Sequence, residues 1–547
     1  MWHVTFVRGR TGHQDDQFTV RAMADHGLLL TFGDAIDRDL SRRIANLTDS
    51  LEVELTEGVI DYVPSYTTLV VLIDPVKVNR ADVIARVRYH WLRIMETPVL
   101  AGSTDEVVIP VEYGGKAGPD LPEVARVTGL TSDQVIQRHA SGSYQVGAIG
   151  FSPGFAFLIG LPPELAVPRR STPRIAVPRG SVGIGGKQTG IYSLATPGGW
   201  SLIGRTPLTM FDPDREPPSL LKAGDTVRFE RLDGPIVARP TRERSRSPAP
   251  RPVSDAIEVL EPGLQTSVQD LGRIGYGRLG IAPGGGADRS ALIAGNRLAG
   301  NSDGAAGLEL SLAGPRLRFL RPGRIAITGA DLGAVLNGLR VPPGARRVVG
   351  PGDELAFGQG RGVGARAYLC LGGGIDVPVV LGSRATDLTA GFGGFDGRAL
   401  RRGDRLQVGQ QWAEDAAREL PETVNAGTVI RIARGPHTDR FDDAAYDLFL
   451  SRQFTVSPQS NRLGVRLIGP TILSLGGADI ISEGMMTGVI QITGEGQPIV
   501  MLPARATIGG YPKIATVIAA DLDRLGQLRP GRQIRFQDVT STVVTGW

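Results

Sequence analysis

Glycine is the residue that most constrains the fold of this chain, because 74 of its 547 residues are Gly. That is about twice the usual share. The glycines follow no fixed period, which excludes a collagen-like helix, and they lie between short runs of Val, Ile and Leu. Short apolar runs bounded by glycine turns are typical of β-strands. The sequence therefore predicts a β-rich fold with many tight turns.

Length, charge and cysteine content exclude several classes of protein. At roughly 150 residues per domain, the chain should hold three or four domains. A net charge of +4 over 547 residues is too small to indicate a nucleic-acid-binding surface. The single cysteine, Cys370, excludes a disulfide framework, and its position in an apolar run is that of a core residue. The six histidines form no HxxxH or HExxH motif, so we expect no metal site.

The sequence also carries expectations about location. No apolar run approaches the roughly 18 residues of a membrane-spanning helix. The first residues lack the apolar segment and cleavage site of a signal peptide. We therefore expect a cytoplasmic protein that contacts neither membrane nor nucleic acid.

Hydrophobic spacing divides the chain into five segments. Helical periodicity over 37–55 and 79–92, with apolar strand runs at 28–32 and 68–73, predicts an α/β domain at the N-terminus. Turns followed by short strands recur later in the chain and predict similar barrel modules. The expected segments are the α/β domain 1–95, a β-barrel domain 96–235, a Pro/Arg/Ser-rich linker 236–254, and two further β-barrel domains, 255–424 and 425–547.

The densest group of candidate binding residues lies between 150 and 207. A P-loop is absent, because Gly186-Lys187 is followed by Gln188 instead of Ser or Thr, and no biotin-attachment motif is present. Glycine clusters can still direct backbone N–H groups at an anion, and basic side chains can bind carboxylate or phosphate. The alternative is turn glycines in a barrel with solvated basic residues. The candidates are Arg174, Gly185, Gly186, Lys187, Gln188, Thr189 and Arg205.

A second group lies near the C-terminus and suits an amide or carboxylate substrate. Only five lysines occur in the chain, so Lys513 beside a glycine turn stands out. The alternative is ordinary turn chemistry with a surface Glu–Lys pair. The candidates are Asn461, Arg462, Glu483, Gln491, Gly509, Gly510 and Lys513.

Two further residues complete the candidates. Asp288 follows a glycine turn at 284–286. His139 ends a helical stretch just before the glycine-rich segment, and an unperturbed histidine titrates near pH 6.5. His139 is thus a candidate acid or base, with a structural role as the alternative.

Long motifs in both halves resemble a known family. The N-terminal half is similar to the B subunit of 5-oxoprolinase, also called allophanate hydrolase subunit 1, through GFSPGFAFLIGLP, TPRIAVPRGSVGIGGKQTGIY and TPGGWSLIGRTP. The C-terminal half is similar to the C subunit of the same enzyme through PGLQTSVQDLGRIGYGRLG, VSPQSNRLGVRL, SEGMMTGVIQI and IGGYPKIATVIAADL. The same modules resemble the carboxyltransferase region of urea carboxylase and the Kip kinase-inhibitor pair. The linker 236–254 falls where the two subunits would be joined, so the chain looks like a natural B–C fusion.

The resemblance implies an α+β, β-rich fold in which an α/β N-terminal domain is followed by cyclophilin-like β-barrels. It implies ATP-dependent opening of the 5-oxoproline lactam to glutamate, with ATP and Mg²⁺ and no biotin on this chain. The implied partner is the separate, LamB/YcsF-like A subunit. A homo-oligomer is a further expectation. We assign Arg174 and Lys513 as charge clamps and Glu483 or His139 as the proton carrier.

Several positions depart from the family pattern, and two of them lose a polar group. Phe157 and Ile508 stand where the family usually has a tyrosine and a threonine, which removes two hydroxyls from the candidate walls. Two alternative functions therefore stay open. One is a carboxyltransferase-like component that acts on urea or another amide with a separate biotin carrier. The other is a non-enzymatic Kip-like regulator of a histidine kinase, since a fold does not fix a function.

Overall fold

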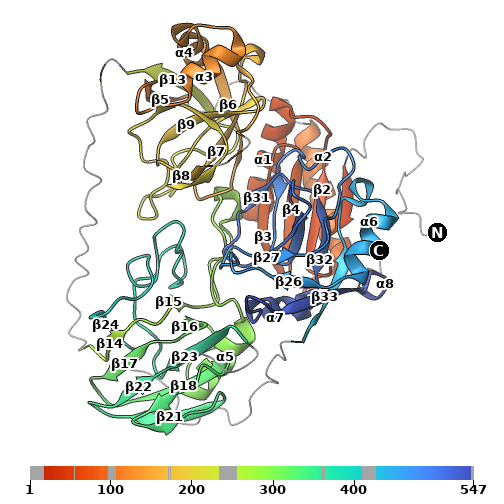
Figure 1. Cartoon of the computed structure of the whole chain (residues 1–547). Helices are drawn as coiled ribbons and strands as arrows, with labels where there is room; N and C mark the ends of the chain where they lie inside the picture. The colour runs from red at the N-terminus through yellow and green to blue at the C-terminus, as the bar shows by residue number, and fades with distance from the viewer. Residues whose placement is uncertain are drawn as a thin grey trace.

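The chain folds into four parts that pack side by side (Figure 1). They are an N-terminal α/β domain, a first barrel, a two-sheet domain and a second barrel. The computed structural model describes residues 18–54, 56–96, 106–170, 172, 174–232, 234, 255–358, 364–409 and 427–543. The predicted linker 236–254 and the predicted boundary near 425 lie outside the described residues.

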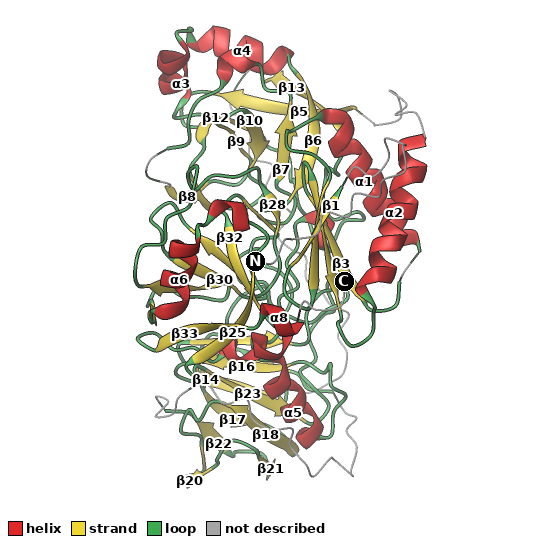
Figure 2. Ribbon diagram, turned by 90° about the vertical axis from the view of Figure 1, so that its right-hand side faces the viewer, coloured by secondary structure: helices red, strands yellow, loops and turns green. Residues whose placement is uncertain are grey.

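The N-terminal domain is a four-stranded antiparallel sheet with two helices on one face (Figure 2). The helices form where the apolar spacing predicts them, and the Asp37 side chain caps the first by accepting the Leu40 N–H at 2.8 Å. The opposite sheet face turns toward the rest of the molecule. In sheet order the strands are β1 (Thr19–Ala22), β2 (Gly27–Thr31), β4 (Thr68–Ile73) and β3 (Val59–Pro64), and the helices are α1 (Arg38–Val53) and α2 (Arg80–Glu96).

The first barrel is closed by seven strands, with helices α3 (Leu121–Thr128) and α4 (Ser132–Ser141) over one end. A short two-stranded ladder of β8 (Arg174–Val177) and β11 (Thr196–Gly198) lies outside the closed ring. The ring consists of β5 (Glu106–Tyr113), β13 (Thr226–Arg231), β6 (Ser143–Ile149), β7 (Ala156–Ile159), β10 (Gln188–Ile191), β9 (Ser181–Gly185) and β12 (Ser201–Arg205).

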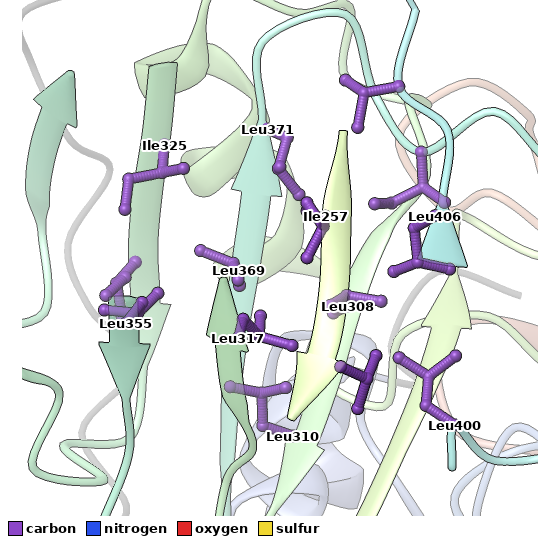
Figure 3. Packing of buried hydrophobic residues seen from close by; sticks show 14 of the residues in the cluster. Ile257, Leu308, Leu310, Leu317, Ile325, Leu355, Leu369, Leu371, Leu400 and Leu406 are labelled. Carbon is purple, nitrogen blue, oxygen red and sulfur yellow. The ribbon is translucent and has the colours of Figure 1, made fainter. Parts of the chain in front are cut away.

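Residues 255–409 form two sheets that share one core, where we expected a closed barrel over 255–424. The turns at 351–353 and 402–404 each lead into a strand of one open sheet, and the described strands leave each sheet with open edges. Leu308, Leu317 and Leu369 come from both sheets and interdigitate between them (Figure 3). One sheet holds β20 (Leu339–Arg340), β19 (Val335–Leu336), β22 (Glu354–Ala356), β17 (Arg316–Phe319), β14 (Ile257–Glu261) and β24 (Arg405–Leu406). The other holds β15 (Gln265–Gln269), β16 (Gly307–Ser311), β23 (Arg366–Leu371), β18 (Gly323–Gly329) and β21 (Ala345–Val349), with α5 (Arg289–Ala299) packed on it.

The second barrel repeats the strand order of the first. Each ring begins with a parallel pair, β5–β13 or β25–β33, and then runs antiparallel in the same sequence order. An outer ladder of β28 (Glu483–Gly484) and β31 (Ile508–Gly509) occupies the place of β8–β11. The ring consists of β25 (Val429–Arg434), β33 (Gln533–Asp538), β26 (Phe454–Val456), β27 (Gly464–Ile468), β30 (Pro498–Met501), β29 (Val489–Ile492) and β32 (Lys513–Val517), with helices α6 (Asp443–Ser451), α7 (Leu522–Gly526) and α8 (Thr540–Val543).

One hydrophobic cluster joins the N-terminal sheet to both barrels. It includes Val63 and Val70 of the sheet, Trp200 of the first barrel, and Met485 and Ile508 of the second. The cluster also contains Phe157, so the two departures that lose a polar group are buried core positions. The halves of the chain are therefore joined by a continuous core.

Glycines allow the halves to approach this closely. A methyl group on Gly484 would lie 2.7 Å from Val70 Cγ2 and 2.9 Å from the Val63 carbonyl oxygen. A methyl group on Gly150 would overlap the Ile508 side chain. Real Cβ atoms do not approach other atoms this closely, so part of the high glycine content serves the interface between the halves.

Candidate functional site

The second barrel places the C-terminal candidates around its outer ladder. Glu483 begins β28 opposite Gly509 of β31, and Lys513 begins the ring strand β32. The Lys513 Nζ donates to Glu483 Oε2 at 2.5 Å, and the Lys513 side chain is fully buried. The predicted Glu–Lys pair is therefore buried, which differs from the surface pair left open as the alternative.

His437 completes this group, and sequence analysis missed it. Its Nδ1 accepts the main-chain N–H of Lys513 at 2.9 Å, so Nδ1 carries no proton. Its Nε2 lies 3.2 Å from Glu483 Oε2 and can only donate there. His437 is thus held as the neutral tautomer protonated on Nε2. Its sequence context, Gly435-Pro436-His437, carries no signal that separates it from the other histidines.

The charges of the cluster of Glu483, Lys513 and His437 follow from this geometry. Burial raises the pKa of Glu483, but Lys513 and the His437 contact outweigh it and lower that pKa to about 2. Burial lowers the pKa of His437. At neutral pH the cluster thus holds a carboxylate and a neutral imidazole, so Glu483 has no proton to give and is a weak base.

Neighbouring residues fix the ladder that carries Glu483. The Gln491 side chain donates to the Tyr511 carbonyl oxygen at 3.0 Å, and a methyl group on Gly509 would lie 2.8 Å from that amide nitrogen. The Ser65 hydroxyl of the N-terminal domain donates to the Ser482 carbonyl oxygen at 2.5 Å. The structure therefore brings Glu483, Lys513, Gln491, Gly509 and Gly510 together where the second barrel meets the N-terminal sheet.

The first barrel holds a different ion pair at the equivalent ladder. Arg174 begins β8 opposite Gly198, and its Nη2 donates to Asp120 Oδ1 at 2.7 Å. The other oxygen of Asp120 accepts the Leu202 main-chain N–H at 2.7 Å. Asp120, like His437, thus links the outer ladder to the start of a ring strand. Sequence analysis missed Asp120, whose only local signal is its place at a helix start.

The glycine run of the first barrel packs against the Trp200 side chain. A methyl group on Gly183, Gly185 or Gly190 would lie 3.3, 2.6 or 3.0 Å from Trp200. These residues also pair within β9 and β10. Gly186 forms the left-handed turn between the two strands, where Lys187 is exposed and Gln188 is half-buried. The run is a packing surface for Trp200 and a hairpin, and it does not form a phosphate cradle.

His139 lies in the core of the first barrel, away from the Glu483 cluster. It is fully buried; its Nδ1 lies 2.8 Å from the Tyr113 hydroxyl and its Nε2 3.0 Å from the Thr189 hydroxyl. Burial lowers the pKa of His139 to about 3. Both ring nitrogens are satisfied by core residues, so the geometry is that of a structural histidine, and Thr189 belongs to the same core.

Arg462 and Asp288 meet in a buried polar network between the two-sheet domain and the second barrel. Arg462 donates to Glu309, and Gln527 donates to Asp288 at 2.6 Å. Asp288 also caps α5 by accepting the Ala291 N–H, and burial raises its pKa to about 6. This network fastens two domains together and is separate from the Glu483 cluster.

The remaining candidates have local structural roles. Asn461 is exposed and accepts the Leu463 N–H in a turn. Arg205 is exposed and donates to the Arg179 carbonyl oxygen. Cys370 is fully buried. Across the described ranges, no group of three or more His, Cys, Asp or Glu side chains is arranged to hold a metal ion, and no helix is long and apolar enough to span a membrane.

Comparisons with known proteins match both halves of the chain. The family model described as carboxyltransferase domain, subdomain C and D, matches residues 18–221, and the model described as subdomain A and B matches 279–538. The 5-oxoprolinase B subunit of Bacillus subtilis is 38% identical over 40% of this chain and 93% of its own length. The 5-oxoprolinase C subunit of Escherichia coli is 38% identical over 51% of this chain and 90% of its own length. The chain belongs to the family of the 5-oxoprolinase B and C subunits.

The family resemblance stated from the sequence motifs is thereby confirmed, as is the fused order of a B-like and a C-like half. The crystal structure of TTHA0988 has a TM-score of 0.81 and 36% identity, and covers 95% of this chain and 100% of its own. That protein therefore shares the whole arrangement. The urea amidolyase of Saccharomyces cerevisiae is 34% identical over 51% of this chain but only 16% of its own length.

Proposed function

We propose that this chain is the fused B–C component of an ATP-dependent 5-oxoprolinase, which opens the 5-oxo-L-proline lactam to L-glutamate together with a separate A subunit. The observation that carries the proposal is that one chain matches two separately named subunits of this enzyme, each over at least nine-tenths of its length. The continuous core between the halves supports a single working unit. An ATP-dependent reaction draws on the cytoplasmic nucleotide pool, which supports a cytoplasmic location.

The Glu483 cluster is the proposed reaction site. Lys513 has two further ammonium N–H groups besides the one bonded to Glu483, and these can stabilise negative charge on the lactam oxygen as the ring opens. Glu483 pairs with the Lys513 ammonium group and orients it. His437 holds both of them, through the Lys513 main chain on one side and the Glu483 carboxylate on the other. Lys513 is thus the charge clamp, and Glu483 is its counter-ion.

ATP would supply the activation that an amide needs, because phosphorylation of the lactam oxygen makes the ring carbon open to attack by water. The ring C–N bond then breaks, and a second water releases the phosphate to leave glutamate. The glycine run 183–190 does not fit this nucleotide, since its strands pair with each other and Trp200 covers it. ATP and Mg²⁺ would therefore bind outside that run, in the complex with the A subunit.

A coupled assay of the full chain tests the proposal. Phosphate and glutamate release are measured with 5-oxoproline and ATP for this chain on its own, for the isolated A subunit, and for the mixture. We expect equal amounts of both products, only in the mixture. If the folded chain gives no glutamate when it is mixed with the A subunit, 5-oxoproline and ATP, the proposed function is wrong.

A second candidate function is carboxyl transfer to urea or another amide from a separate biotin carrier. It is favoured by the carboxyltransferase description of both matching family models and by the urea amidolyase relatives. Those relatives are matched over less than a fifth of their length, which is why this function ranks second. Carboxylation of urea that depends on an added biotinylated carrier would favour it.

A further inference from the structure

The outer ladder of the first barrel carries polar groups that its described neighbours leave unsatisfied. Arg174 and Thr196 lie on the inward face of this ladder, because Arg174 is opposite Gly198 and Thr196 is opposite Val177. The alternating residues Ile175 and Pro197 point outward and are exposed.

Two buried atoms on the inward face lack partners. Neither Arg174 Nη1 nor Thr196 Oγ1 has a hydrogen-bond partner within the described part of the chain, and Thr196 is only 4% exposed. Leaving such groups unpaired inside a folded protein is unfavourable. Unpaired buried donors that share one face are what a ligand-binding site without its ligand presents.

The charge around this face is positive. Arg170 lies 3.3 Å from Asp120, which Arg174 also contacts, and Arg169 lies 3.8 Å from Asp479 of the second barrel. Three guanidinium groups thus face two carboxylates. Such a balance favours one additional negative charge.

A neutral donor completes the face. The hydroxyl of Tyr192 occupies the space that a methyl group on Gly198 would need, so Gly198 leaves room for this hydroxyl beside Arg174. Burial raises the pKa of Tyr192 to about 12, which keeps it protonated and able to donate.

We propose that Arg169, Arg170, Arg174, Tyr192 and Thr196, hereafter the Arg174 site, bind a carboxylate or phosphate group, separately from the Glu483 cluster. The two barrels then carry two sites at equivalent ladders: an anion site in the first and the lysine–glutamate site in the second. Arg174 thereby keeps its predicted role as a charge clamp. The neutral donors beside it are the hydroxyls of Thr196 and Tyr192, where the sequence predicted the main-chain N–H groups of the glycine run. The inference does not require turnover, so its failure is distinguishable from failure of the proposed function.

Isothermal titration calorimetry of the full chain tests the Arg174 site. The ligands are 5-oxo-L-proline, pyrrolidin-2-one (the same lactam without a carboxylate) and inorganic phosphate. The variants are Arg174→Gln and Thr196→Val, where valine has nearly the shape of threonine and preserves folding. Arg126→Gln is the matched control, because Arg126 is an exposed arginine of the same barrel that pairs with its helix neighbour Glu123.

We expect binding of at least one anion, weakened about tenfold or more by Arg174→Gln and about threefold by Thr196→Val, with Arg126→Gln unchanged. Binding of 5-oxo-L-proline without pyrrolidin-2-one would identify a carboxylate as the bound group, and binding of inorganic phosphate would identify a phosphate. If wild type binds neither anion at millimolar concentration, or if both ladder variants bind like wild type, the Arg174 site is overturned.

Discussion

The two barrels share one strand order but differ in the ion pair that each holds at its outer ladder. In the second barrel, Glu483, Lys513 and His437 bond one another, and Lys513 is fully buried. In the first barrel, Arg174 bonds Asp120 but keeps one N–H without a partner among the described residues. The same strand order therefore carries a mutually bonded Glu483–Lys513 pair in the second barrel. In the first barrel it carries an arginine with a donor that the described residues leave free, which can bind an anion.

Replacing Lys513 should have the largest effect. In Lys513→Met the buried Glu483 carboxylate loses its counter-ion, which should cost about 3 kcal/mol of unfolding free energy. Loss of the charge clamp should also lower turnover by about 100-fold or more in the coupled assay. Denaturant unfolding and glutamate release measure the two effects.

Two further variants separate loss of the Glu483–Lys513 ion pair from non-specific loss of stability. Lys222→Met replaces an exposed lysine and should leave both quantities unchanged. Glu483→Gln combined with Lys513→Met should recover part of the lost stability, because no unpaired charge remains. A double variant no more stable than Lys513→Met would contradict a buried, mutually dependent pair.

Acid should release the second barrel's ion pair. The pKa of Glu483 is lowered from 4.5 to about 2, so its stabilisation is fully present above pH 4.5 and lost as pH falls toward 2. A lowering of this size corresponds to about 3 kcal/mol. Wild type and Glu483→Gln should therefore differ most in unfolding free energy near pH 6 and converge near pH 2. A difference that stays constant over this range would show that Glu483 is not held as a carboxylate by Lys513.

The glycine run of the first barrel should respond as packing. Gly185→Ala would place a methyl group 2.6 Å from Trp200 and should cost about 2 kcal/mol by overpacking. Gly304→Ala is the control, because its nearest side-chain atom lies 4.0 Å away. Scanning calorimetry should show a lower Tm only for Gly185→Ala, with phosphate binding unchanged. Loss of phosphate binding at an unchanged Tm would restore the run as an anion cradle.

Much of the fold could be predicted from the sequence because local patterns decide it. The strand over Thr68–Ile73 and the helices α1 and α2 follow directly from apolar spacing. The two open sheets of residues 255–409 could not be predicted, because a turn followed by a short strand looks the same in a closed barrel and in two packed sheets. Which edges close depends on long-range pairing that no local pattern encodes.

The site was predictable only in part, for a similar reason. Lys513 stood out because lysine is rare here, and Glu483 because it lies beside glycine turns. His437 and Asp120 could not be found, since each acts through contacts with residues at least 46 positions away. His139 looked like an acid or base only because sequence does not report that its ring is buried between Tyr113 and Thr189.

Replacing His437 should have the smallest effect and tests one specific hydrogen bond of the second barrel. His437→Gln keeps an N–H that can reach Glu483 but removes the ring nitrogen that accepts the Lys513 main-chain N–H. We expect kcat to fall about fivefold with KM nearly unchanged, since one hydrogen bond of about 1 kcal/mol is lost. Because burial lowers the pKa of His437, the shape of the activity profile between pH 6 and 8 should stay the same.

A matched substitution separates positioning by His437 from proton transfer. His90→Gln changes a buried histidine that bonds Ser50 in the N-terminal domain, far along the chain from the second barrel, and should leave kcat unchanged. If His437→Gln instead abolishes an activity limb near pH 6.5 that wild type and His90→Gln both show, His437 carries a proton in the reaction. The cluster of Glu483, Lys513 and His437 would then transfer a proton during the reaction. The two barrels would differ in acid–base chemistry more than in how their ion pairs are bonded.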